Sequence, residues 1–91
     1  MAEITGVLIF KDEVKQVTEK FIKQDFVLKT TDEFPQEIIL EVQNDKVNLL
    51  QDKAIGSLLR VTYNLTGRCV VKEEKRTWFL TLRAWRVSLF S

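Results

Sequence analysis

Residues 20–43 read KFIKQDFVLKT, TDEFPQ and EIILEVQ, and this stretch decides the fold. Apolar and polar side chains alternate in the first segment through Phe26 and Leu28, and in the last segment through Leu40. Alternation with a period of two is typical of strands that bury one face. Pro35, the only proline, lies between the two segments and cannot donate to a central sheet ladder. The stretch therefore predicts two strands joined by a turn.

Three more segments have the composition of strands, which makes five in all. The strands are expected at residues 3–10, 20–30, 37–43, 58–66 and 78–87. Residues 11–19 are polar and are expected either to continue the first strand or to form a flexible loop. Gly67 is expected to end the fourth strand, and residues 68–77 to form a charged loop with KEEKR at its tip. Gly6 lies inside the first strand, where glycine often marks a bulge or a close backbone approach.

A single short helix is expected within residues 45–53, after Asn44 or Asp45 as the capping residue. Its apolar side chains Val47, Leu50 and Ala54 repeat at helical spacing and are expected to plug one end of a barrel.

Three strands, a short helix and two strands are the element order of the OB-fold, a five-stranded, partly open Greek-key barrel. Consecutive strands at this spacing favour antiparallel pairing. An SH3-like barrel is the main alternative, and the position of the helix argues against it. We expect one all-β domain over residues 1–91.

Composition limits the classes of function. The chain has no histidine, one cysteine, and three glycines that lie far apart. It therefore lacks the commonest general base, the commonest metal ligand, the usual partner of a nucleophilic thiol and a glycine-rich phosphate loop. The paired acids at residues 32–33 and 73–74 are interpreted as solvated turn residues. We expect a protein that is not an enzyme and that has no metal site and no cofactor.

The location of the protein is also predicted from the composition. A single cysteine excludes an internal disulfide and fits a reducing compartment. No run approaches the roughly 20 apolar residues of a membrane span, and the first ten residues do not resemble a signal peptide. We expect a cytoplasmic protein without membrane contact.

The net charge of +1 conceals an asymmetry between the two halves of the chain. Residues 1–50 hold six basic and ten acidic side chains, whereas residues 51–91 hold eight basic and three acidic ones. A basic half can be the electrostatic footprint of nucleic acid. An unevenly charged solvated surface is the alternative.

Basic residues interleaved with aromatics favour binding of a single-stranded nucleic acid, because such proteins stack bases on aromatic rings and hold phosphates with cations. The nucleic acid is expected to lie across the second and third expected β-strands and to contact the loops at residues 11–19 and 68–77. The candidate phosphate contacts are Lys15, Lys20, Lys23, Arg68, Lys72, Lys75 and Arg76, and the candidate stacking residues are Phe21 and Trp78.

An alternative interpretation is that the aromatic side chains only fill the barrel. We favour it for Phe26 and Tyr63, which lie on the apolar faces of their strands, and we place Trp85 in the core or in a subunit interface. Glu37 and Glu41 count against a nucleic-acid groove along the third expected strand, since carboxylates repel phosphates.

Several segments resemble a small bacterial family of OB-type domains of unknown function that are similar to single-stranded-DNA-binding proteins. The segments are EITG (3–6), KQDFVLKT (23–30), Phe34–Pro35, LEVQNDKVNLL (40–50), IGS (55–57), LTGR (65–68) and WFLTLRAWRV (78–87). The chain departs from the family at Ser57, where we expect an acidic residue, and after Arg68, where the loop lacks a glycine. The resemblance implies the OB-fold and, by kinship, sequence-independent binding of single-stranded DNA, with RNA as the alternative, as an accessory to replication or repair.

Exposed apolar residues on the expected barrel suggest self-association. Ile39 and Leu58 are expected on outward faces, and Val87, Leu89 and Phe90 at the end of the chain. We expect a homodimer or a higher homo-oligomer. A protein-interaction or oligomerisation module without significant nucleic-acid binding is the second hypothesis for function, and binding of an oligosaccharide on the same face is the third.

Overall fold

The structure is a computed structural model, and it describes residues 1–90. The strands are β1 (Ala2–Lys11), β2 (Lys15–Thr18), β3 (Phe21–Thr30), β4 (Glu37–Gln43), β5 (Leu58–Lys72) and β6 (Lys75–Leu89). The 3-10 turn η1 (Asn44–Val47) and the short helix α1 (Asn48–Gln51) lie between β4 and β5. No helix within residues 1–90 is long and apolar enough to cross a membrane.

Five of the strands form a closed ring. β3 pairs antiparallel with β1 and β4, and β5 pairs antiparallel with β1 and β6. A short parallel contact between Glu41 of β4 and Arg83 of β6 closes the ring. This arrangement confirms the predicted all-β OB-type barrel with one short helix after its third long strand. Two details differ from the prediction: the closing contact is parallel, and β2 adds a sixth strand to the edge of β3.

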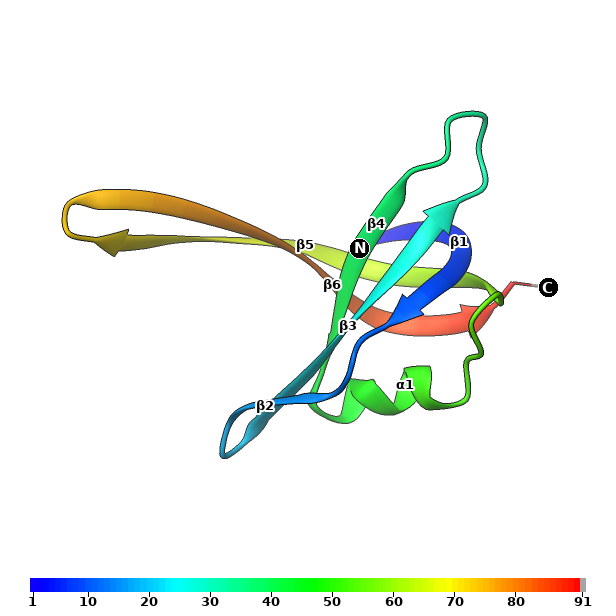
Figure 1. The fold of residues 1–91 in the computed structure, drawn as a ribbon, viewed down its shortest axis with the longest axis horizontal. Helices are drawn as coiled ribbons and strands as arrows, with labels where there is room; N and C mark the ends of the chain where they lie inside the picture. Colours follow the sequence, from blue (N-terminus) through cyan, green and yellow to red (C-terminus); the bar gives the residue numbers. More distant parts are fainter. Residues whose placement is uncertain (91) are drawn as a thin grey trace.

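The expectation of a loop at residues 68–77 is wrong, because β5 and β6 continue as a long two-stranded hairpin (Figure 1, yellow to orange). Gly67 does not end a strand but pairs with Leu80. The turn consists only of Glu73 and Glu74, which have φ angles of 54° and 66°. A two-residue turn with positive φ at both positions matches the twist of a hairpin. We call residues 65–72 and 75–82 of this hairpin the ribbon.

The core lies inside the ring and confirms the alternation read from residues 20–43. Phe26 and Leu28 of β3 and Leu40 and Val42 of β4 are almost completely buried. Tyr63 is partly buried and packs against this core.

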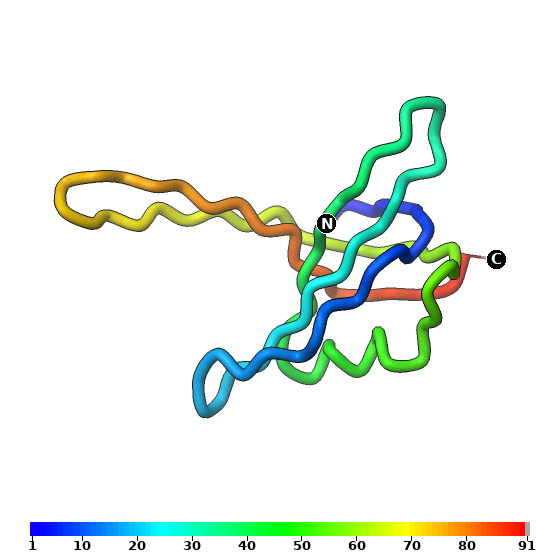
Figure 2. Tube along the Cα trace, viewed as in Figure 1, coloured from blue at the N-terminus to red at the C-terminus, as the bar shows by residue number. Residues whose placement is uncertain are grey.

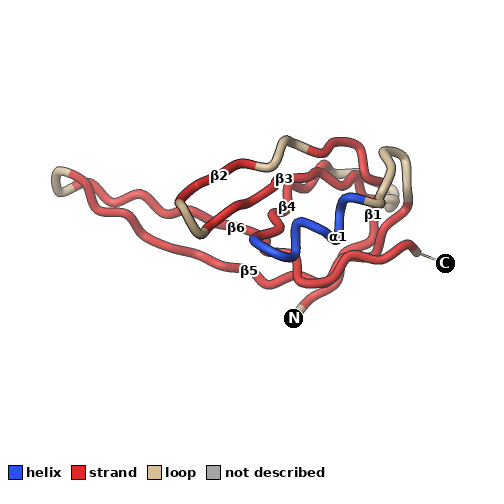
Figure 3. The backbone as a smooth tube through the Cα atoms, turned by 90° about the horizontal axis from the view of Figure 1, so that it is seen from below, coloured by secondary structure: helices blue, strands red, loops and turns tan. Residues whose placement is uncertain are grey.

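The short helix covers one end of the ring (Figures 1 and 3). Val47 and Leu50 are buried there, as predicted. Ala54 is exposed, contrary to the prediction, because α1 ends at Gln51 and Ala54 lies beyond it. Lys11 of β1 caps the helix end, since its Nζ donates to the Leu50 carbonyl at 3.2 Å and to a second carbonyl three residues later at 2.7 Å.

Two local irregularities shape the barrel wall. A Cβ atom at Gly6 would lie 2.7 Å from the Lys29 carbonyl oxygen, so the expected close backbone approach is confirmed. Thr62 of β5 pairs with Arg86 of β6, and the next residue, Tyr63, pairs with Ala84. Trp85 is thus left as the extra residue of a bulge in β6. The bulge breaks the alternation of β6, so that Ala84 and Val87 both face the core. The expectation of an exposed Val87 is therefore wrong.

Candidate nucleic-acid interface

Two hairpins project from the same side of the barrel, the β2–β3 hairpin and the longer ribbon (Figure 2). A groove of 420 Å³ lies between them on the outer surface, and we call it the outer groove. Its lining residues are Val17, Phe21, Lys23, Glu41, Gln43, Thr66, Arg68, Phe79, Leu80 and Thr81. The groove therefore combines two phenylalanine rings with two basic side chains.

Strand alternation explains why these side chains meet. Phe26 faces the core, so Phe21 and Lys23, at odd positions of the same strand, point outward. On the ribbon, Arg68 and Phe79 are direct cross-strand partners and therefore share a face. The Arg68 guanidinium carbon lies 5.4 Å from the centroid of the Phe79 ring, which is 47% exposed.

The acidic residue in the groove is already neutralised. Lys23 Nζ lies 3.3 Å from Glu41 Oε1, and Gln43 Nε2 donates to the second carboxylate oxygen of Glu41 at 2.5 Å. Glu41 is almost completely buried under these partners. The Glu41 carboxylate thus holds the Lys23 side chain in place, and because its charge is paired it repels a phosphate less strongly than the sequence suggested.

Lys15 stands apart from the groove and has a partner of its own. Its Nζ lies 3.1 Å from Asp12 Oδ2. The hydrogen bond from the Glu13 backbone N–H and the contact with Lys15 hold the pKa of Asp12 below its ordinary value, and Asp12 raises the pKa of Lys15. A phosphate at Lys15 has to compete with this exposed ion pair.

The two faces of the ribbon differ in character. Paired residues share a face and successive residues alternate between faces. The cationic face consists of Thr66, Arg68, Val70, Lys72, Lys75, Thr77, Phe79 and Thr81. The apolar face consists of Leu65, Gly67, Cys69, Val71, Arg76, Trp78, Leu80 and Leu82.

Of the nine residues selected from the sequence, the structure brings three into the outer groove: Phe21, Lys23 and Arg68. Lys72 and Lys75 continue the cationic face toward the tip. These two lysines do not line the groove itself, and the remaining four selected residues lie neither in the groove nor on the cationic face: Lys15, Lys20, Arg76 and Trp78. Phe79 does line it and was missed, because only the register of the hairpin shows that it pairs with Arg68 and that Trp78 faces the other way.

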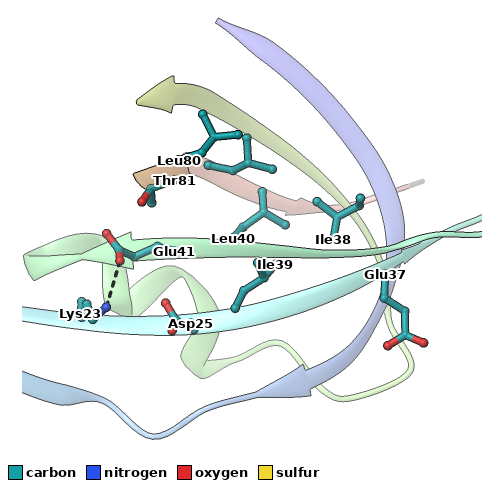
Figure 4. Close-up of a pocket in the computed structure, with 10 residues that line it drawn as sticks. Lys23, Asp25, Glu37, Ile38, Ile39, Leu40, Glu41, Leu80 and Thr81 are labelled. Atoms are coloured by element: carbon teal, nitrogen blue, oxygen red, sulfur yellow. Dashed lines mark hydrogen bonds and ion pairs between the residues drawn. The ribbon is translucent and has the colours of Figure 1, made fainter. Parts of the chain in front are cut away.

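A second groove of 420 Å³ lies where β4 and β6 diverge, and we call it the β4 groove (Figure 4). Ile38, Leu40 and Leu80 give it an apolar floor, and Asp25 and Glu37 are among the side chains that line it. Within residues 1–90, neither carboxylate has a basic group within 4.0 Å. Carboxylates repel a phosphate backbone, so this groove is a poor candidate for nucleic acid.

Trp85, expected in the core or in an interface, is half-buried beside two cations. Arg83 Cζ lies 4.7 Å and Lys46 Nζ 5.9 Å from its ring centroid. Trp85 thus packs beside two cations of its own chain, and it is not among the residues that line the outer groove.

The chain belongs to a family described as a domain of unknown function, DUF3127, whose sequence model matches residues 3–88. No curated protein sequence matches the chain. Its fold is that of single-stranded-DNA-binding proteins. It is similar to the mitochondrial single-stranded-DNA-binding protein Rim1 of S. cerevisiae, with a TM-score of 0.69 and 15% identity over 97% of this chain and 91% of that one. It is also similar to the small single-stranded-DNA-binding protein of Streptomyces coelicolor, with a TM-score of 0.63 and 12% identity over 98% and 92%.

Proposed function

We propose that the protein binds single-stranded DNA, largely independently of sequence, in the outer groove and along the cationic face of the ribbon. The observation that carries the proposal is the arrangement of Phe21, Lys23, Arg68 and Phe79 around one open groove. Aromatic rings next to cations are what a single strand needs, because its bases expose their faces and its phosphates carry charge.

Each group has a defined role in this proposal. Phe21 and Phe79 stack on bases, and Arg68 supports the Phe79 ring while it contacts a phosphate. Lys72 and Lys75 extend the phosphate track toward the tip of the ribbon. Lys15, Lys20 and Arg76 contribute through the general electrostatic field, because they lie outside the groove.

The groove favours a single strand over a duplex. Stacking on Phe21 and Phe79 requires unstacked bases, which a duplex does not offer. Stacking is also tolerant of sequence, since every base has a π-face. The two proteins of similar structure are both single-stranded-DNA-binding proteins, which supports the proposal at the level of the fold.

We extend the proposal to the setting of the protein. It acts by binding and not by catalysis, in the reducing cytoplasm that a single free cysteine fits. A domain that covers exposed single strands would serve as an accessory in replication or repair.

A titration of fluorescently labelled oligonucleotides tests the proposal, with single-stranded DNA, single-stranded RNA and duplex DNA of equal length at two salt concentrations. We expect the single strands to bind more tightly than the duplex, and the affinity to fall as salt rises. Absence of binding even at low salt would leave a protein-interaction module as the function.

A further inference from the structure

Two cations and one indole gather where β6 contacts the turn η1, and we call them the Trp85 site. Arg83 Cζ lies 4.7 Å and Lys46 Nζ 5.9 Å from the centroid of the Trp85 ring, and all three side chains are half-buried. The Nε1 atom of Trp85 is buried, so this edge of the indole is packed against the chain. One fixed ring thus holds two positive charges from different elements close together.

Neither cation of the Trp85 site is neutralised by an ion pair. In the part of the chain that the structure describes, no carboxylate oxygen lies within 4.0 Å of a side-chain nitrogen of Arg83 or Lys46. Glu41 is the backbone partner of Arg83, but its carboxylate is bound to Lys23. Asp45, next to Lys46 in η1, is exposed and makes no ion pair with it. Two like charges held at one ring repel each other, and an anion such as a phosphate group relieves this repulsion.

The Trp85 site continues the outer groove along β6. Thr81 lines the groove, and Arg83 follows it on the same outward face, because side chains alternate and Ala84 faces the core. On the opposite wall, Gln43 lines the groove and η1, which carries Lys46, begins at the next residue. A nucleic acid that leaves the groove along β6, away from the tip of the ribbon, therefore passes both cations.

We propose that Arg83 and Lys46, positioned on the Trp85 ring, bind phosphates of the same single strand beyond the outer groove. The inference rests on the proposed function and extends it from a groove to a longer track. This track runs along the outward face of β6, from the ribbon through the outer groove to the end of the barrel that η1 and α1 cover. A short oligonucleotide seated on Phe21 and Phe79 leaves the Trp85 site empty, whereas a longer one reaches it.

Affinity as a function of oligonucleotide length tests the proposal, with labelled single-stranded DNA of about 4 to 16 nucleotides, the range of sites on OB-folds. Wild type and Arg83→Gln/Lys46→Gln should bind the shortest oligonucleotides equally. For the longest ones, the salt slope of the wild type should be steeper by about 1.4 units. Between about 50 and 200 mM salt, its affinity should therefore fall about sevenfold more than that of the variant. The matched control Lys29→Gln/Arg60→Gln, which also removes one lysine and one arginine outside the outer groove, should behave like the wild type.

The outcomes separate this inference from the proposed function. If the wild type binds no single strand of any length, the proposed function fails and the Trp85 site fails with it. If the wild type binds but Arg83→Gln/Lys46→Gln matches it at every length, the Trp85 site is overturned while the outer groove stands. A variant with native circular dichroism that also loses affinity for the shortest oligonucleotides contradicts the placement of the site beyond the groove.

A spectroscopic test leaves both cations in place and does not depend on the folding of the double variant. Trp78 and Trp85 are the only tryptophans, and Trp78 lies on the apolar face of the ribbon, outside the outer groove. In Trp78→Phe the tryptophan emission therefore comes from Trp85 alone. A saturating long oligonucleotide should change this emission, and one that fills only the outer groove should not. Unchanged emission with the long oligonucleotide would show that the DNA does not reach the Trp85 site.

Discussion

The guanidinium of Arg68 lies over the ring of Phe79, with 5.4 Å between the guanidinium carbon and the ring centroid, and the two residues are direct cross-strand partners in the ribbon. An exposed cation–π contact is worth about 0.5–1 kcal/mol, enough to bias the orientation of a half-exposed ring. The contact therefore favours a ring position beside Arg68, and both residues line the outer groove. This contact is the local feature from which the proposed binding surface is built.

The two lysines at the tip of the ribbon should act on the electrostatic part of binding. Each phosphate that a protein neutralises contributes about −0.7 to the slope of log affinity against log salt for a single strand. Lys72→Gln/Lys75→Gln should therefore flatten the slope measured with labelled oligonucleotide by about 1.4 units. The matched control is Arg60→Gln/Arg86→Gln, which removes two cations outside the groove. A control that flattens the slope more than the ribbon variant would move the DNA track to that other surface.

Neighbouring residues of β4 should differ sharply in their contribution to stability. Leu40 is 1% exposed, so Leu40→Ala should lower the free energy of unfolding by about 2–5 kcal/mol. Ile39 is 60% exposed, and Ile39→Ala should change it by no more than about 0.5 kcal/mol. Urea denaturation followed by tryptophan fluorescence measures both values. Equal effects would mean that the alternation of this strand is assigned to the wrong faces.

Two glycines provide a second matched pair. A Cβ at Gly6 would lie 2.7 Å from a backbone oxygen of β3, so Gly6→Ala should destabilise the barrel by about 1–3 kcal/mol, the range for overpacking. A Cβ at Gly67 would have Phe79 O, at 3.8 Å, as its nearest neighbour, so Gly67→Ala should be neutral or stabilise by up to about 1 kcal/mol. The midpoint of thermal unfolding should therefore fall for Gly6→Ala and should stay the same or rise for Gly67→Ala. A Gly6→Ala variant as stable as the wild type would show that β1 and β3 lie further apart.

The barrel was predictable from the sequence because its strands bury one face. Phe26, Leu28 and Leu40 repeat at the period of a strand, and the pattern identifies both the element and its buried side. The outer half of the ribbon was not predictable in this way. Its charged centre reads as a loop, and its turn uses two glutamates where an asparagine–glycine pair is the usual signal. The bulge at Trp85 depends on pairing with a distant strand, which local sequence does not record.

The candidate site was predictable only in part for the same reason. Alternation along β3 places Phe21 and Lys23 on the face opposite Phe26, so the sequence was sufficient to predict that they point outward. The choice between Trp78 and Phe79 depends on which residue pairs with Arg68, and that register exists only in the folded hairpin.

Asp12 should titrate below its ordinary pKa of 3.8. The main cause of the lowered pKa is the hydrogen bond that the Glu13 backbone N–H donates to Asp12 at 2.8 Å, and the contact with Lys15 is the second cause. Because the folded-state pKa is depressed, the contribution of Asp12 to stability is present above the unfolded-state pKa and is lost as the pH falls through the folded-state value. In an NMR titration, Lys15→Gln should raise the midpoint only part of the way. A complete return to 3.8 would assign the whole shift to Lys15.

In the proposed function, single strands bind in the outer groove by stacking on Phe21 and Phe79. The most direct measurement is the affinity of a labelled single-stranded oligonucleotide at low salt for wild type, for Phe21→Ala/Phe79→Ala, and for the control Phe10→Ala/Phe34→Ala, which removes two exposed rings outside the groove. Each stacked base is worth about 1–3 kcal/mol, so the groove variant should bind at least about tenfold more weakly with an unchanged salt slope. The control should bind like the wild type. Equal affinities for the groove variant and the wild type would show that single strands do not stack in this groove, and no binding by the wild type would rule out the proposed function.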